Sequence, residues 1–113
     1  MPRFYIVEDD SAVGDSLAVF LSSHGHDAVR YGDAESFFRE VVPVAGDTLI
    51  VDIGLPGMSG SQLIRWVSKL RDEPSIIVIS GKSELNLRSE LEGLPVKRLI
   101  RKPFDASAVE ALL

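Results

Sequence analysis

Along its 113 residues the chain alternates five times between short apolar runs rich in β-branched residues and segments with a helical spacing of apolar residues. This alternation is typical of repeated strand–helix units around a parallel sheet. The expected strands span residues 3–7, 27–31, 48–53, 75–80 and 96–101. The third and fourth are almost continuously apolar, which predicts central strands covered on both faces. The pattern favours an α/β fold, with one doubly wound sheet of five parallel strands and helices on both faces.

The segments between these strands predict five helices. Ser59 and Gln62 have the spacing of a capping box, in which two side chains satisfy backbone N–H groups at the start of a helix. Asp33 and Asp105 are placed to cap two other helices, and Pro43 follows the last turn of one of them. The helices are expected after Ser11, over residues 33–42, after Ser59, over residues 83–92 and after Asp105.

Composition narrows the class of protein. A chain of this length with 45% hydrophobic residues is expected to form a single domain over residues 1–113. It has no cysteine, which excludes disulfides and thiolate metal sites and favours a cytoplasmic compartment. No apolar stretch approaches the length of a membrane span, and the start does not resemble a signal peptide. The net charge of -5, without a Lys or Arg stripe, predicts that this domain alone binds no nucleic acid.

Acidic residues stand at the ends of two of the predicted apolar runs. Glu8 and Asp9 follow the first apolar run, and Asp52 follows the third. The carboxyl ends of parallel strands lie at one sheet edge, where open α/β sheets bind their ligands, so these carboxylates should converge. By itself Asp52 is compatible with a surface charge, a helix cap, a metal ligand or a nucleophile that forms an acyl phosphate. Three crowded carboxylates need a compensating cation, and oxygen ligands without His or Cys favour Mg²⁺.

Two further strand ends carry groups suited to a phosphoryl group. Ser80 follows the fourth apolar run with a hydroxyl, and Lys102 follows the fifth with an ammonium group. Both groups bind phosphoryl oxygens. Taken separately, Ser80 could open a turn before Gly81 and Lys102 could be a solvated charge, but the four matching strand ends favour a phosphoryl-acceptor site.

These segments resemble the receiver domain of the two-component response regulators. The matching motifs are IVEDD at residues 6–10, IVDIGLPGMSG at residues 50–60, ISG at residues 79–81 and KPF at residues 102–104. The resemblance covers essentially the whole chain. It implies the flavodoxin-like strand order 2-1-3-4-5 of the bacterial chemotaxis regulator.

The resemblance implies a role for each acidic residue. Asp52 becomes the phosphoacceptor. Asp9 becomes a direct Mg²⁺ ligand and Glu8 a direct or water-mediated one, while Asp52 and the main-chain carbonyl of Gly54 complete the metal set.

The resemblance also assigns the remaining site residues. Ser80 becomes the switch hydroxyl, and Lys102 the phosphoryl-binding ammonium beside a cis peptide bond to Pro103. Leu99 stands where the family usually has an inward-turning Tyr or Phe, so we hypothesise that signalling depends on backbone movement of the segment from Ser80 to Ser83. Lys82 would add positive charge near the path of the hydrolytic water. The sequence leaves open whether this charge speeds or slows dephosphorylation.

The family's partners follow from the same resemblance. A sensor histidine kinase, a phosphotransfer protein or a small acyl phosphate would supply the phosphoryl group, and the domain would catalyse its own phosphorylation and dephosphorylation while acting mainly as a switch. Output would pass through the face built by the fourth helix, the fifth strand and the fifth helix, which also serves homodimers. We expect the chain to be the N-terminal part of a longer regulator.

Other classes of protein fit less well. A flavodoxin-like cofactor carrier needs a Gly, Ser or Thr-rich phosphate loop where this chain has Glu8 and Asp9. A dehalogenase-like phosphatase needs a second Asp where this chain has Gly54. The remaining alternative is a receiver-fold interaction module that binds its partners independently of phosphorylation.

Overall fold

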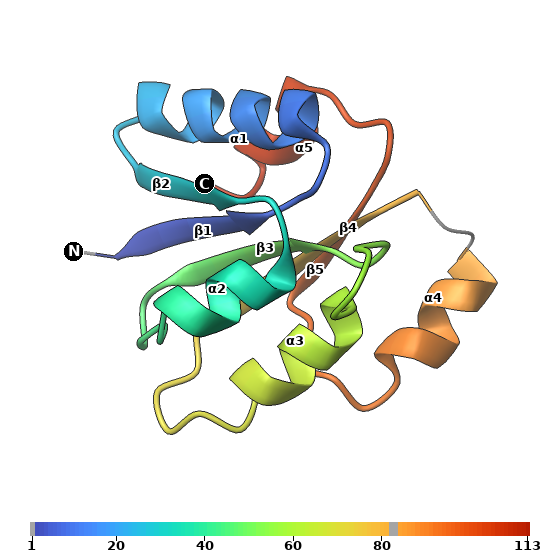
Figure 1. Ribbon diagram of the computed structural model, residues 1–113. Helices are drawn as coiled ribbons and strands as arrows, with labels where there is room; N and C mark the ends of the chain where they lie inside the picture. Colours follow the sequence, from blue (N-terminus) through green and yellow to red (C-terminus); the bar gives the residue numbers. More distant parts are fainter. Residues whose placement is uncertain (1, 82–83) are drawn as a thin grey trace.

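The sheet has the predicted architecture, with five parallel strands in the order β2-β1-β3-β4-β5 (Figure 1). It is seen in a computed structural model that describes residues 2–81 and 84–113, without the side chains of residues 84–86 and 88. The strands are β1 (Arg3–Val7), β2 (Asp27–Tyr31), β3 (Thr48–Asp52), β4 (Ser75–Ser80) and β5 (Arg98–Arg101). The prediction of a doubly wound sheet is therefore confirmed, with β3 at its centre.

Helices cover both faces of the sheet (Figure 1). On one face lie α1 (Ser11–Ser23) and α5 (Ala106–Glu110), and on the other lie α2 (Ala34–Glu40), α3 (Gly60–Val67) and α4 (Glu84–Leu91). The longest of them, α1, has 13 residues. Within residues 2–81 and 84–113, no helix is both long and apolar enough to cross a membrane.

The central strand shows why the sequence requires two helical layers. Side chains alternate between the faces of a strand. Leu49 and Val51 pack into the core beneath α2, α3 and α4, whereas Ile50 packs into the core beneath α1 and α5. All three are buried, and burial of each such side chain is worth about 1.5–3 kcal/mol. An apolar run without alternation is thus stable only with helices on both sides.

Three of the predicted helix caps are present. The Asp33 carboxylate accepts from the Ser36 N–H at 2.7 Å and begins α2. Ser59 and Gln62 form the full capping box of α3. Asp105 caps α5. Each cap satisfies backbone donors that have no partner within the helix.

Two predicted element boundaries are wrong by two residues. The second helix ends at Glu40, because Val41 is extended, with φ -129° and ψ 136°. The residue before a proline is disfavoured in a helix, so Pro43 excludes Val42 from α2, and the helix ends one residue earlier still. The fifth strand begins at Arg98, since the Val96 N–H donates to the Leu94 carbonyl in a tight turn.

Two other boundaries are simpler. The third strand ends at Asp52 instead of residue 53, although the Ile53 N–H still donates to the Ile79 carbonyl at 3.1 Å. The fourth helix is present as α4, and its expected first residue lies outside the described residues.

Candidate functional site

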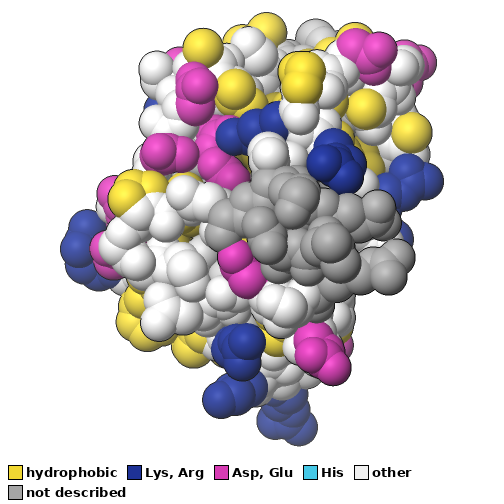
Figure 2. Space-filling view, turned by 90° about the vertical axis from the view of Figure 1, so that its right-hand side faces the viewer, with side chains coloured by type: hydrophobic (Ala, Val, Ile, Leu, Met, Phe, Trp, Pro, Cys, Tyr) yellow, Lys and Arg dark blue, Asp and Glu magenta, His cyan; other side chains and the backbone are white. Residues whose placement is uncertain are grey.

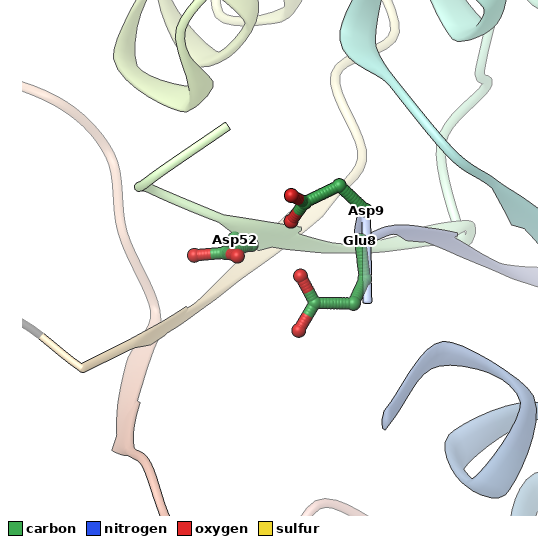
Figure 3. A group of neighbouring side chains, drawn as sticks. All are labelled: Glu8, Asp9 and Asp52. Carbon is green, nitrogen blue, oxygen red and sulfur yellow. The ribbon is translucent and has the colours of Figure 1, made fainter. Parts of the chain in front are cut away.

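Three carboxylates converge at the carboxyl ends of β1 and β3. Glu8 and Asp9 directly follow β1, and Asp52 is the last residue of the adjacent β3. Each contributes a carboxylate oxygen to a group whose members all lie within 4.8 Å of one another. Figure 3 shows the Glu8 and Asp9 side chains turning from the end of β1 toward the end of β3. The sheet thus brings together the acidic residues that the sequence expects at this edge.

The members of this acidic cluster differ in exposure. The side chain of Glu8 is completely buried, Asp52 is 6% exposed, and Asp9 is exposed. The face formed by the carboxyl ends of the strands shows acidic side chains adjoining basic ones (Figure 2). The cluster therefore runs from the protein interior to an open surface.

Lys102 connects the acidic cluster to the carboxyl ends of β4 and β5. Its Nζ lies 2.5 Å from Glu8 Oε1 and 3.1 Å from Asp52 Oδ2. The backbone N–H of Lys102 donates to the Ser80 carbonyl at 2.8 Å, and the Lys102–Pro103 peptide bond is cis, as the resemblance implies. With all three carboxylates ionised, one ammonium leaves an excess of about two negative charges.

Burial and pairing move the pKa values of the buried acids apart. Burial, followed by the hydrogen bond with Asp52, raises the pKa of Glu8 from 4.5 to about 8 despite the attraction of Lys102. Burial also pushes the pKa of Asp52 upward, but hydrogen bonds with Glu8, the Gly54 N–H and Lys102 outweigh it and lower that pKa. Loss of water opposes the charge on Lys102, and its two carboxylate partners still raise its pKa. At neutral pH the Glu8 carboxyl group is therefore mostly protonated, and the Asp52 carboxyl group is ionised.

Two glycines surround Asp52. The Gly54 N–H donates to Asp52 Oδ1 at 2.9 Å and orients the carboxylate. At Gly60, the first residue of α3, an added Cβ would lie 2.6 Å from the Asp52 carbonyl oxygen and 2.9 Å from Ile53 Cα. Only glycine allows the start of α3 to approach the end of β3 so closely. Sequence reasoning assigned no role to Gly60, although the glycine directly after the Ser59 cap was the available signal.

A family model described as the response regulator receiver domain matches residues 4–113. The chain belongs to this family. It is 30% identical over 107 residues to the transcriptional regulatory protein FixJ of Azorhizobium caulinodans, covering 95% of this chain and 51% of that protein. It is 32% identical over 106 residues to the sensory transduction protein RegX3 of Mycolicibacterium smegmatis, covering 94% of this chain and 46% of that protein. The chain thus spans about half the length of these curated relatives.

Solved structures show the same fold. The crystal structure of FixJ-N superposes with a TM-score of 0.80 at 27% identity, covering 98% of this chain and 89% of that one. The CheY-like receiver domain from Methanospirillum hungatei superposes with a TM-score of 0.83, covering 99% of this chain and 90% of that one. At 24% identity, this second likeness concerns the fold alone. The chain is therefore a response regulator receiver domain of two-component signalling.

The receiver domain places the other predicted site residues on β4 and β5. Ser80 ends β4 and is completely buried, one residue beyond the pairing of Ile79 with Asp52. Leu99 lies on the edge strand β5, where it is 38% exposed. Lys82 lies outside the described residues.

The acidic cluster of the receiver domain fits a magnesium ion. Receiver domains generally use Mg²⁺, which prefers oxygen ligands from a few carboxylates and from water. Both carboxylate oxygens of Glu8 are buried, and their close contacts with Lys102 and Asp52 do not have the regular geometry of hydrogen bonds. A buried acid with so little compensation, beside an exposed Asp9, is suited to a divalent cation that approaches from solvent.

Proposed function

We propose that this receiver domain accepts a phosphoryl group on Asp52, in a reaction that requires Mg²⁺. The donor is a sensor histidine kinase, a phosphotransfer protein or a small acyl phosphate. The observation that carries the proposal is the state of Asp52, an ionised carboxylate at the sheet edge with Lys102 Nζ 3.1 Å from its Oδ2. An ionised carboxylate is a far better nucleophile toward phosphorus than a protonated one, so this state suits Asp52 to attack.

The transfer forms one bond and breaks one. An Asp52 carboxylate oxygen attacks the phosphorus of the donor, and the phosphorus–nitrogen bond of a phosphohistidine breaks. The imidazole leaves with the bonding electron pair and takes a proton from solvent, while Asp52 becomes an acyl phosphate. The Gly54 N–H and Lys102 hold the carboxylate in place, so the domain contributes positioning and charge compensation.

The metal ligands in this proposal are Glu8, Asp9, Asp52 and the main-chain carbonyl of Gly54. When bound, Mg²⁺ supplies the positive charge that allows a dianionic phosphoryl group to approach three carboxylates. Glu8 must lose its proton to serve as a ligand. The exposed side chain of Asp9 keeps one side of the site open to a cation and to a donor.

Lys102 and Ser80 respond to the new charge in this proposal. Lys102 transfers its contact from the Asp52 carboxylate to a phosphoryl oxygen, and the Ser80 hydroxyl donates to another. Hydrolysis of the acyl phosphate by water returns Asp52 to its first state, so the domain is mainly a switch that catalyses its own two steps. The resulting shift between two conformations changes the face made by α4, β5 and α5.

Output and context complete the proposal. The face made by α4, β5 and α5 binds the target or a second copy of the domain, and Leu99 lies on it without an aromatic ring. Backbone movement after Ser80 then carries the signal. The domain acts in the cytoplasm as the N-terminal part of a longer regulator, in keeping with relatives about twice its length.

Intact mass spectrometry after incubation with acetyl phosphate tests this function. The parent should gain a single phosphoryl group with Mg²⁺ and none with excess chelator, and Asp52→Asn should gain none. Asp33→Asn, which changes an aspartate outside the acidic cluster, should behave like the parent. The absence of the adduct in every protein and condition would count against the proposal and favour a phosphorylation-independent interaction module. An adduct that persists in Asp52→Asn would contradict the assignment of the acceptor.

A further inference from the structure

An arginine from β2 holds the backbone that carries two of the proposed metal ligands. Arg30 Nη2 donates to the Glu8 carbonyl at 2.9 Å and Nε donates to the same oxygen at 3.2 Å. Nη2 also lies 3.4 Å from the Asp9 carbonyl oxygen. The guanidinium thus contacts two successive carbonyls at the point where the chain leaves β1. These contacts hold the backbone from which the Glu8 and Asp9 side chains extend.

A buried glycine on α1 makes room for this arginine. Arg30 pairs with Ile6, whose side chain lies beneath α1, so Arg30 extends along the same face of the sheet. A Cβ added to Gly14 would lie 2.6 Å from Arg30 Cδ and closer still to Nε. Glycine within a helix is unfavourable, so its presence here calls for a packing reason. The stem of Arg30 is that reason.

The other contact of Arg30 is too weak to explain its position. Arg30 Nη1 lies 3.8 Å from Asp15 Oδ1, and the Asp15 side chain is mostly exposed. Exposed ion pairs of this kind contribute little. The charge of Arg30 would moreover repel a cation at the acidic cluster. Any gain in metal affinity therefore comes from the geometry of the guanidinium fork, whereas the charge of Arg30 lowers the affinity.

We propose that Arg30 is a positioning residue for the Mg²⁺ site and that Gly14 is the residue that admits it. By holding the Glu8 and Asp9 carbonyls, Arg30 keeps both carboxylates turned toward Asp52 before the metal arrives. This inference rests on the proposed function only in requiring that Mg²⁺ binds at the acidic cluster. It can be measured without phosphorylation.

Mg²⁺ affinity, measured by isothermal titration calorimetry on the whole chain, tests the role of Arg30. Arg30→Met should weaken binding about tenfold, the lower end of the effect of residues that orient metal ligands. Arg30→Lys should also weaken binding several-fold, because an ammonium retains the charge but has no planar fork. The matched control is Arg3→Met, since Arg3 Nε also joins β1 to β2 by a 2.6 Å bond to Asp27, at the opposite end of the strands. The control should bind Mg²⁺ as the parent does.

A double-mutant cycle separates positioning from folding. Gly14→Ala should weaken Mg²⁺ binding several-fold by displacing Arg30, without lowering resistance to urea, because alanine favours the helix. In an Arg30→Ala background, adding Gly14→Ala should leave Mg²⁺ affinity unchanged, since the two residues act through one contact. Both comparisons remain valid if one variant loses some stability.

The outcomes separate this inference from the proposed function. Mg²⁺ affinity in Arg30→Met equal to the parent's would overturn the positioning role, and tighter binding would show in addition that the repulsive charge of Arg30 dominates. Equal affinities in Arg30→Lys and the parent would overturn it also. If the parent gains no phosphoryl group yet Arg30→Met weakens Mg²⁺ binding, the inference is supported and the proposed function fails. If the parent binds no Mg²⁺, both fail.

Discussion

The two halves of the site are supported in different ways. At the ends of β1 and β3, the backbone is held by Arg30, by the close approach of Gly60 and by the Gly54 N–H on Asp52. At the ends of β4 and β5, an added Cβ on Gly81 would meet no atom of the described residues within 4 Å. Of the four residues of β5 only Ile100 is buried.

This difference separates two tasks that one sheet edge must perform. Metal ligands and a nucleophile work best in a fixed arrangement, because their convergence is costly to rebuild for each reaction. A switch needs a segment with few packing constraints that can take a second conformation. The central strand β3 therefore carries the acceptor, and β4 and the outer strand β5 lead to the groups proposed to respond.

The largest effect is expected from the buried acid of the fixed half. Glu8 has a folded-state pKa of about 8 against an ordinary 4.5, so the folded protein retains a proton that the unfolded chain releases between these values. Without metal, the parent's free energy of unfolding should therefore fall as pH rises from about 4.5 to about 8, by an order of a few kcal/mol. Glu8→Gln cannot ionise and should lack this decline. Asp52 has a lowered pKa and acts with the opposite sign below 3.8, outside this window.

Urea unfolding in excess chelator, at several pH values, measures this decline. Mg²⁺ at pH 8 should raise the free energy of unfolding of the parent and raise that of Glu8→Gln little, because the variant lacks one carboxylate ligand. Parallel pH curves for the two proteins in chelator would contradict the burial of an ionisable Glu8.

Substitutions at two glycines test whether the backbone is packed more tightly at the end of β3 than at the end of β4. Gly60→Ala should lower the free energy of unfolding by about 1–3 kcal/mol, because its Cβ would lie 2.6 Å from the Asp52 carbonyl oxygen and backbone must move. Gly81→Ala is the matched control, since among residues 2–81 and 84–113 its Cβ would meet no described atom within 4 Å and its φ is not positive. Its stability should remain within about 0.5 kcal/mol of the parent's.

Thermal and urea unfolding of the two alanine variants check this pair. Equal losses in both would mean that the ends of β3 and β4 are equally constrained, which would remove the basis of the comparison. A loss at Gly60 that is accompanied by weaker Mg²⁺ binding would sharpen it, because Gly60 would then also shape the position of Asp52.

The sequence predicted the acidic residues of the site, but it did not predict the residues that hold their backbone in place. The convergence of Glu8, Asp9 and Asp52 follows from local strand patterns and the single rule that parallel strands end at one edge. The contact of Arg30 with Gly14 has no such rule, because a lone arginine in a strand usually indicates an exposed position. Tertiary packing alone places that arginine beneath α1.

The boundaries of the helices and strands also divide into those that nearby residues predict and those that they do not. The cap at Ser59 was predictable because its partner Gln62 is three residues away. The end of α2 was also marked locally, by Pro43, and we placed it too late. The short β5 was not marked, since Val96 has a strand-forming side chain and is drawn into a turn by the Leu94 carbonyl.

The smallest effect on the fold is expected on β5, at the position where the family usually has an aromatic residue. Leu99 is 38% exposed, so Leu99→Tyr should change the free energy of unfolding by no more than about 0.5 kcal/mol. The extent of phosphorylation by acetyl phosphate should equal the parent's, because the substitution leaves the acidic cluster intact. Association of two phosphorylated copies should change several-fold if the face of α4, β5 and α5 carries the output.

Sedimentation equilibrium after incubation with acetyl phosphate and Mg²⁺ measures that association, and intact mass confirms equal phosphorylation. Val42→Tyr is the matched control, because Val42 is an exposed aliphatic residue just after α2 and away from β5. Equal association constants for the parent, Leu99→Tyr and Val42→Tyr would remove Leu99 from the switch. A change confined to Leu99→Tyr would show that the outer strand β5 couples phosphorylation at the end of the central strand β3 to association of two copies.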